Sequence, residues 1–281
     1  MPNTHLLCAD RSLIIFGGPY SNLEATQALL AEAARRGFAP ENIICTGDVV
    51  AYCADAQATL DLVMRSGVHV LMGNCEEQLA ANADDCGCGF ESGTACDLLS
   101  ATWYAHAARH VRNDQRAWMS ALPRRVDIEI GGRRLAVIHG GVERIADYVF
   151  ASTPDVEKAR QIAITGVDGV IGGHCGLPFT QIIDGRLWHN AGSIGMPANE
   201  GLPRVWFSVL SPQRGGLRIS HHSLEYDYAS AAAKMRAAGL PAGYADALSS
   251  GLWPSLDVLP DAERRAAGAP LGLADVFWPA P

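Results

Sequence analysis

Residues 13–48 read LIIFGGPYSNLEATQALLAEAARRGFAPENIICTGD, and their pattern sets the class of fold. Residues 13–16 form a short apolar run that ends in two glycines and a proline, which predicts a buried strand entering a tight loop. Asn22 can cap a helix over residues 23–36, and residues 43–46 predict the next strand. Strand, loop, helix and strand in this order predict an α/β fold with a parallel sheet and right-handed crossovers.

The alternation of strands and helices continues with a helix over 55–65 and a strand over 68–72, and it ends near residue 80. Residues 80–124 combine a loop rich in Gly and Cys with two helical segments, at 97–108 and 114–122, which predicts a small helical cap inserted over the sheet. The order and short turns of the later strands suggest a second, mainly antiparallel sheet. These later strands are predicted at 180–183, 187–190, 204–209 and 217–221, and they follow strands predicted at 126–130, 134–138 and 169–171.

Composition narrows the functional classes. The chain has 281 residues and a net charge of −8, so it repels a phosphate backbone and nucleic acid is not an expected partner. We find neither a signal-peptide pattern nor an apolar run long enough to span a membrane, which leads us to expect a cytoplasmic protein. In that compartment the eight cysteines are expected to be thiols. Assembly of the chain into a homo-oligomer remains one possibility.

Polar side chains follow four of the predicted strands. Asp48, Asn74, His139 and His174 each come directly after an apolar run and beside a glycine. Ligands of α/β sheets bind beyond the carboxyl ends of strands, so these side chains are expected to converge. Any one of them alone is most simply a strand-end polar residue, but together they form a nitrogen and oxygen ligand set typical of a Zn, Mn or Fe ion.

The blocks that contain these residues resemble the ordered motifs of calcineurin-like metallophosphoesterases, in particular the bacterial YfcE-type phosphodiesterases. They are Gly47-Asp48, Gly73-Asn74-x-Glu76, His139-Gly140 and Gly173-His174, with a later Asn-Ala-Gly-Ser segment at residues 190–193. The resemblance implies a four-layer sandwich of two central mixed β-sheets flanked by helices. It also implies a single domain over residues 1–252, including the cap at about 80–124, and a C-terminal tail over 253–281 packed on or over the surface.

The departures from the family pattern are as informative as the matches. The family normally places Asp and His where this chain has Gly18 and Tyr20, and its closing His where this chain has Gly176. By the resemblance, these are the private ligands of one of two metals, whereas the ligands of the other metal correspond to Asp48, Asn74, His139 and His174. The resemblance therefore implies a mononuclear centre with one divalent transition metal.

Two further positions are candidate catalytic residues. Cys75 stands where the family has its general-acid His, and a thiol needs help to ionise at neutral pH because its ordinary pKa is about 8.5. Tyr20, at a lost ligand position, is interpreted as a substrate contact or a packing residue rather than a ligand.

By the resemblance, the remaining thiols form a possible cluster near the edge of the sheet where the metal ligands are expected. The simplest interpretation of a cysteine is a small buried apolar residue, but the thiols in the glycine-flanked C-x-C loop gain little from burial. They could bind a soft metal or a thiophilic substrate, or form a redox pair. The candidates are Cys53, Cys86, Cys88, Cys96 and Cys175.

Three functions follow, in order of preference. The first is a metal-dependent hydrolase of a phosphoester or related small molecule, in which Arg144 or His189 could replace part of the lost metal's clamp. The second is a degenerate phosphoesterase that binds a metal or a thiophilic ligand as a regulatory protein. The third is a thiol-based redox or sulfur-transfer enzyme.

Overall fold

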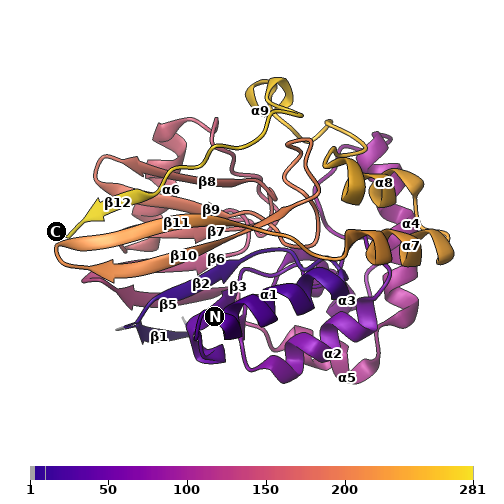
Figure 1. Cartoon of the computed structure of the whole chain (residues 1–281), viewed down its shortest axis with the longest axis horizontal. Coiled ribbons are helices and arrows are strands. Elements are labelled where there is room, and N and C mark those ends of the chain that lie inside the picture. The colour runs from indigo at the N-terminus through magenta and orange to yellow at the C-terminus, as the bar shows by residue number, and fades with distance from the viewer. Residues whose placement is uncertain (1–3, 10, 281) are drawn as a thin grey trace.

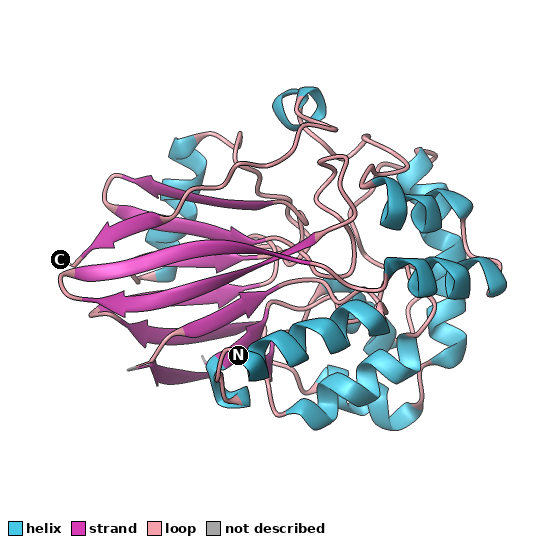
Figure 2. Ribbon diagram, in the orientation of Figure 1, coloured by secondary structure: helices cyan, strands magenta, loops and turns pink. Residues whose placement is uncertain are grey.

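The computed structural model describes residues 4–9 and 11–280, and it contains two six-stranded β-sheets (Figures 1 and 2). Both sheets mix parallel and antiparallel pairs. The first sheet has the order β1 (Thr4–Ala9), β5 (Arg125–Ile130), β6 (Arg133–Ile138), β7 (Gly169–Gly172), β9 (Arg186–Ala191), β8 (Pro178–Ile183). The second has the order β12 (Val276–Pro279), β11 (Gly216–Leu224), β10 (Val205–Gln213), β2 (Leu13–Phe16), β3 (Ile43–Cys45), β4 (His69–Val70).

Three separate apolar clusters show that the elements form four layers. Alternate residues of β2 face opposite ways, as a strand requires, so Leu13 and Ile15 pack between the sheets while Ile14 and Phe16 pack against helices. The outer face of the first sheet is covered by α6 (Asp155–Thr165), whose Ile162 packs in the third cluster. The predicted fold class, two mixed sheets between helices, is confirmed.

Helices cover the outer face of the second sheet and its end (Figure 2). They are α1 (Leu23–Arg35), α2 (Ala56–Ser66), α3 (Asn74–Ala81), α4 (Ala95–His110), α5 (Asn113–Ser120), α7 (Tyr228–Ala237) and α8 (Ala242–Ser250). The Asn22 side chain caps α1 by accepting a hydrogen bond from the N–H of Ala25 at 3.1 Å, as the sequence predicts. None of the helices in the described part of the chain is both long and apolar enough to cross a membrane.

The late strands are arranged differently from the prediction of one mainly antiparallel second sheet. Strands β8 and β9 form a hairpin in the first sheet, whereas β10 and β11 form a hairpin in the second. Strand β1 and helix α3 were not expected from the local sequence pattern. Strand β1 pairs in parallel with β5, which lies more than a hundred residues further along the chain, so its partner cannot be recognised from local sequence.

The region predicted as a cap packs against the helices beside the second sheet. Helix α4 contacts α2 and α5 contacts α3, and Arg112 at the start of α5 forms an ion pair with Asp61 of α2 at 2.7 Å. The loop between α3 and α4 reaches a pocket described below.

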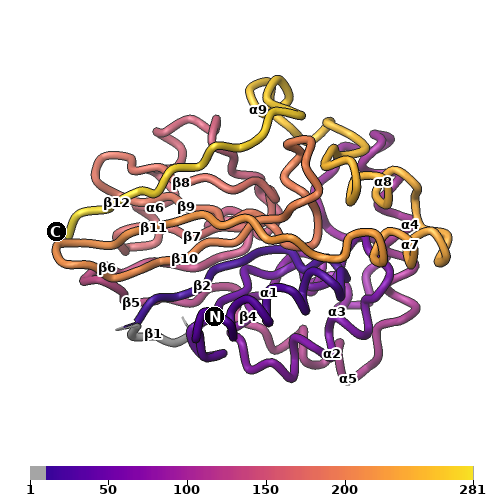
Figure 3. The backbone as a smooth tube through the Cα atoms, viewed as in Figure 1, coloured from indigo at the N-terminus to yellow at the C-terminus, as the bar shows by residue number. Residues whose placement is uncertain are grey.

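The C-terminal tail does more than cover the surface. It runs past α9 (Asp261–Arg265) to the end of the sheets that lies far from α7 and α8, as the yellow trace of Figure 3 shows. It ends there as β12, which pairs with β11. Trp278 of β12 is buried in the cluster between the sheets, and Trp253 at the start of the tail lines the same pocket as the α3–α4 loop. The tail therefore contributes to both the core and the site.

Candidate metal centre

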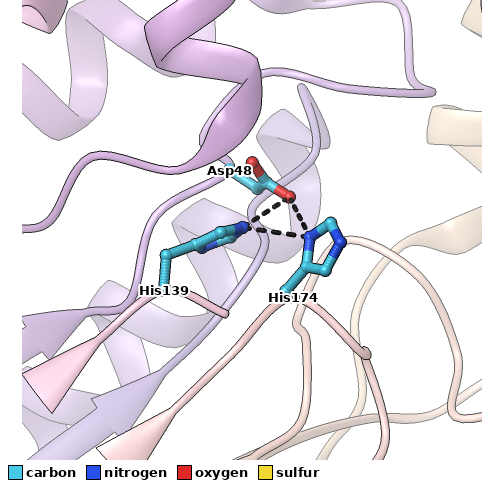
Figure 4. Close-up of side chains that lie close together, drawn as sticks. All are labelled: Asp48, His139 and His174. Atoms are coloured by element: carbon cyan, nitrogen blue, oxygen red, sulfur yellow. Dashed lines mark hydrogen bonds and ion pairs between the residues drawn. The ribbon is translucent and has the colours of Figure 1, made fainter. Parts of the chain in front are cut away.

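Four side chains converge where strands of both sheets end. Asp48 follows β3 and Asn74 begins α3 after β4, both beside the second sheet, while His139 and His174 follow β6 and β7 of the first sheet. Figure 4 shows the carboxylate and the two imidazoles pointing at one another from three separate loops. The convergence that the sequence predicts for these four residues is present in the structure.

The donor atoms lie at distances that suit a single ion. Nε2 of His139 is 3.2 Å from Oδ2 of Asp48, 3.2 Å from Nδ1 of His174 and 3.1 Å from Oδ1 of Asn74. The Asp48, His139 and His174 atoms all lie within 4.8 Å of one another. Two ligand atoms that are each about 2.1 Å from one ion lie roughly 3–4 Å apart, so this donor set fits a divalent transition metal.

The ring of His139 is fixed in the tautomer that a metal ligand needs. Its Nδ1–H donates a hydrogen bond to the carbonyl oxygen of Thr46 at 2.7 Å, because a carbonyl can only accept. That bond leaves Nε2 without a proton in the neutral ring and directs it at Asp48 and His174. A backbone partner of this kind on the second ring nitrogen is typical of metal-binding histidines.

The backbone of the site adopts conformations that residues other than glycine rarely take. Asp48 has a φ of 57°, His174 of 62° and Tyr20 of 53°, all in the left-handed region. The Tyr20 N–H donates to the carbonyl of Asp48 at 3.1 Å, so two of these residues support each other. Strain of this kind persists only where the surroundings enforce it, and such residues cluster at functional sites.

Glu76 fastens the two loops that carry Asp48 and Asn74. Its Oε2 accepts hydrogen bonds from the N–H groups of Asp48 at 2.7 Å and Gly73 at 3.0 Å, and its Oε1 accepts from Val50 at 3.3 Å. The carboxyl is fully buried, and burial, followed by the nearby charge of Asp48, raises its pKa to about 7. The sequence marks Glu76 only as part of a motif, and its role became visible from these bonds.

The charges of the site favour a pair between Asp48 and His139. Burial alone would raise the pKa of Asp48, but the charges and hydrogen bonds of His139 and His174 hold it below its ordinary value. Burial would lower the pKa of His139, yet Asp48 raises it above the ordinary value, whereas burial prevails at His174 and lowers its pKa.

Aromatic rings lie beside Gly18 and Gly176. A Cβ on Gly18 would overlap the ring of Tyr20, and a Cβ on Gly176 would lie 3.4 Å from Cζ2 of Trp253. Trp253 is held there by its ring N–H, which donates to the carbonyl of Pro197 at 2.7 Å. The Tyr20 ring thus occupies the space above Gly18, and the Trp253 ring lies beside Gly176.

The two predicted catalytic residues occupy different places. Tyr20 lines the pocket beside Asp48 and His174, whereas Cys75 is not among the described residues that line it. Cys75 lies behind the carboxylate, with its backbone N–H donating to Oδ1 of Asp48 at 3.3 Å. Burial, and then the charge of Asp48, raise the pKa of its thiol well above the ordinary value.

The cysteines do not behave as one set of thiols. Cys86 and Cys88 form a disulfide, which corrects the expectation that all the cysteines are thiols. Cys88, Cys96 and Cys175 line the pocket. Cys53 is not among the described residues that line the pocket, and its Sγ lies 3.8 Å from the carbonyl oxygen of Gly195.

The two residues considered as substitutes for the lost clamp lie elsewhere. The Arg144 side chain is 81% exposed and pairs with Asp147 at 2.7 Å. His189 is buried between the sheets, with Nε2 2.7 Å from Oγ of Ser208. Neither is among the described residues that line the pocket.

Sequence reasoning missed most of the pocket wall. Tyr52, Tyr148, Tyr244 and Trp253 line it, and the ring of Tyr148 lies 4.1 Å from that of His174, centroid to centroid. Only Tyr52 lies near a motif in the sequence, four residues after Asp48, so a local signal existed for it alone.

Comparisons with known proteins agree with this geometry. Residues 6–210 match the model of the calcineurin-like phosphoesterase superfamily domain. An uncharacterized protein of Methanocaldococcus jannaschii is 23% identical over 239 residues, which are 79% of this chain and 90% of that protein.

Two solved structures share the fold at low sequence identity. A metallophosphoesterase from Sphaerobacter thermophilus superposes with a TM-score of 0.67 at 20% identity, over 87% of this chain and 100% of that chain. A hypothetical protein from Pyrococcus horikoshii superposes with a TM-score of 0.70 at 15% identity, over 86% of this chain and 99% of that chain.

Proposed function

The chain belongs to the calcineurin-like phosphoesterase superfamily, and on that basis we propose that it is a metal-dependent hydrolase with a mononuclear centre. Its substrate is a phosphoester or a related small molecule. The observation that carries the proposal is the convergence of Asp48, Asn74, His139 and His174 at the edge of a pocket, with ligand atoms 3.1–3.2 Å from Nε2 of His139.

The residues around the centre have separate roles in metal binding and substrate contact that fit this proposal. A bound divalent ion supplies Lewis-acid polarisation of a phosphoryl oxygen. Asp48 offers Oδ2 to the centre, while its Oδ1 accepts a hydrogen bond from the N–H of Cys75. Thr46 orients His139, and Tyr20 is the proposed substrate contact, since it lines the pocket next to Asp48. The role of Cys75 as an acid stays a prediction, and Cys75→Ser tests it.

Elemental analysis of purified protein, with and without reconstitution, tests the proposal. About one equivalent of Zn, Mn or Fe is expected in the wild type and is expected to be lost in His139→Ala. His110→Ala, which removes an exposed histidine of α4, is the control and keeps the metal. A metal-loaded protein that hydrolyses members of a phosphoester panel supports the hydrolase. Stoichiometric metal without turnover supports the regulatory binding protein instead.

The disulfide favours one further candidate, the thiol-based enzyme. Cys88 lines the pocket and is bonded to Cys86, so a substrate in the pocket is next to an exchangeable sulfur. Cys88→Ser separates the two functions: thiol chemistry is abolished, whereas metal-dependent hydrolysis is reduced but persists.

A further inference from the structure

The pocket beside the donor set is rich in aromatic side chains. Six aromatic side chains line it together with Asp48 and His174: Tyr20, Tyr52, Phe90, Tyr148, Tyr244 and Trp253. Rings of this kind present large flat apolar faces, and they pair with other rings at centroid distances of about 4.5–7 Å.

Four of the rings contact one another or a ring of the donor set. The centroid of Tyr52 is 4.9 Å from that of Tyr20 and 4.7 Å from that of Tyr244. On the other side, Tyr148 lies against the His174 ring at 4.1 Å. A substrate whose reacting group sits at Asp48 and His174 therefore has aromatic surface directly beside it.

Much of the pocket wall comes from segments outside the metal motifs. Phe90 belongs to the loop between α3 and α4, Tyr244 belongs to α8, and Trp253 begins the tail. Tyr244 and Trp253 lie beyond residue 210, where the match to the superfamily domain ends. Two of the six rings thus come from the part of the chain that follows the matched domain.

The charge of the pocket limits what it can hold. None of the described residues that line it is a lysine or an arginine, and its ionisable side chains are Asp48, His174, tyrosines and cysteines. A negative charge buried without a cationic partner is costly, so an ion could balance one or two charges but a polyphosphate chain would stay unpaired.

We propose that this pocket is a subsite for a flat aromatic substituent of the substrate, with Tyr52, Tyr244 and Trp253 as its specificity-determining residues. The substrate class is an aryl- or heteroaryl-bearing phosphoester of low charge. This proposal rests on the proposed function, because it places the phosphoryl group at Asp48 and His174.

Two substrates that differ only in the substituent test the proposal on metal-loaded protein. They are methyl phenylphosphonate and methyl methylphosphonate, which share the leaving group and the charge, so that only one of the two carries a ring. The expected kcat/KM is about tenfold or more higher for the phenyl compound, because burying a ring is worth at least that factor. Tyr244→Leu reduces this ratio, whereas Phe277→Leu, at an exposed ring of β12, leaves it unchanged. Equal kcat/KM values in the wild type overturn the proposal without any variant.

A binding measurement separates the subsite from the hydrolase. Calorimetric titration with benzenesulfonate and methanesulfonate compares two stable monoanions with and without a ring. At least tenfold tighter binding of benzenesulfonate, weakened in Tyr244→Leu and Trp253→Leu, supports the subsite even if no phosphoester is hydrolysed. Hydrolysis accompanied by equal affinity for the two sulfonates leaves the proposed function standing and refutes the subsite.

Discussion

His189 of β9 and Ser208 of β10 meet across the interface between the two sheets, with Nε2 2.7 Å from Oγ. The other ring nitrogen of His189 lies 2.8 Å from Oγ1 of Thr180, which is also 2.9 Å from Nε2 of His221. Two histidines and two hydroxyls thus form a polar network between otherwise apolar layers. Such a network stabilises the fold only while its histidines stay uncharged.

Stability is expected to fall as the pH drops from about 6.5 to about 4. Burial, and then the charge of His222, lower the pKa of His221 to about 4, and burial lowers that of His189 well below its ordinary value. The unfolded chain binds these protons near pH 6.5 and the folded chain does not, so folding is opposed below that pH. Each histidine adds a slope of up to about 1.4 kcal/mol per pH unit.

Urea unfolding at several pH values measures this slope. His221→Gln is expected to flatten it whatever it does to absolute stability, while His110→Gln, at an exposed position, keeps the wild-type slope. A pH dependence that is the same in all three proteins contradicts the prediction.

Replacing Glu76 by glutamine is expected to weaken both the fold and the centre. One of its carboxylate oxygens accepts from two N–H groups, and an amide nitrogen cannot accept, so at least one bond to Asp48, Gly73 or Val50 is lost. Losing a buried hydrogen bond to a charged group costs about 1.5–3 kcal/mol. Denaturant unfolding and metal affinity measure the two effects. The adjacent Glu77→Gln, which removes an ion pair with Arg124 near the surface, is the matched control and should cost less than about 1 kcal/mol.

Opening the Cys86–Cys88 disulfide is expected to lower metal affinity. Nδ2 of Asn74 donates to the carbonyl of Cys86 at 2.9 Å and lies 3.4 Å from Sγ of Cys88, which keeps Oδ1 on the side of His139. Once the disulfide is open, the loop holds the Asn74 side chain less firmly. Loss of such support for a metal ligand costs about 10–100-fold in metal affinity.

Chelator competition measures the effect after treatment with a phosphine reductant that is removed before metal is added. Cys88→Ser should reproduce the loss without reductant. Cys96→Ser, a pocket thiol outside the disulfide, should keep the wild-type affinity and remain sensitive to the reductant. Unchanged affinity in reduced wild type and in Cys88→Ser would show that the loop does not hold Asn74.

The ligand set could be predicted from sequence because each member directly follows an apolar run, and strand ends are local features. Asp48 and His139 also lie beside glycines, which allow the close approach of the loops: a Cβ on Gly47 would lie 2.9 Å from Nδ1 of His139. The hairpins β8–β9 and β10–β11 have similar local patterns, so nothing local assigns them to different sheets. Trp253 reaches the pocket only through the path of the tail, which tertiary packing determines.

Gly18 and Gly176 allow a last comparison, because both have a positive φ, 41° and 71°, and both lie beside an aromatic ring. Gly176→Ala is expected to cost about 1 kcal/mol, since its Cβ would only touch Trp253 and the cost comes from the backbone. Gly18→Ala adds an overlap with the Tyr20 ring and is expected to cost about 2–4 kcal/mol. In a double-mutant cycle with Tyr20→Ala, the cost of Gly18→Ala should fall to that of Gly176→Ala, because only the backbone contribution remains. Additive costs, measured by urea unfolding, would mean that the Tyr20 ring does not fill the space above Gly18.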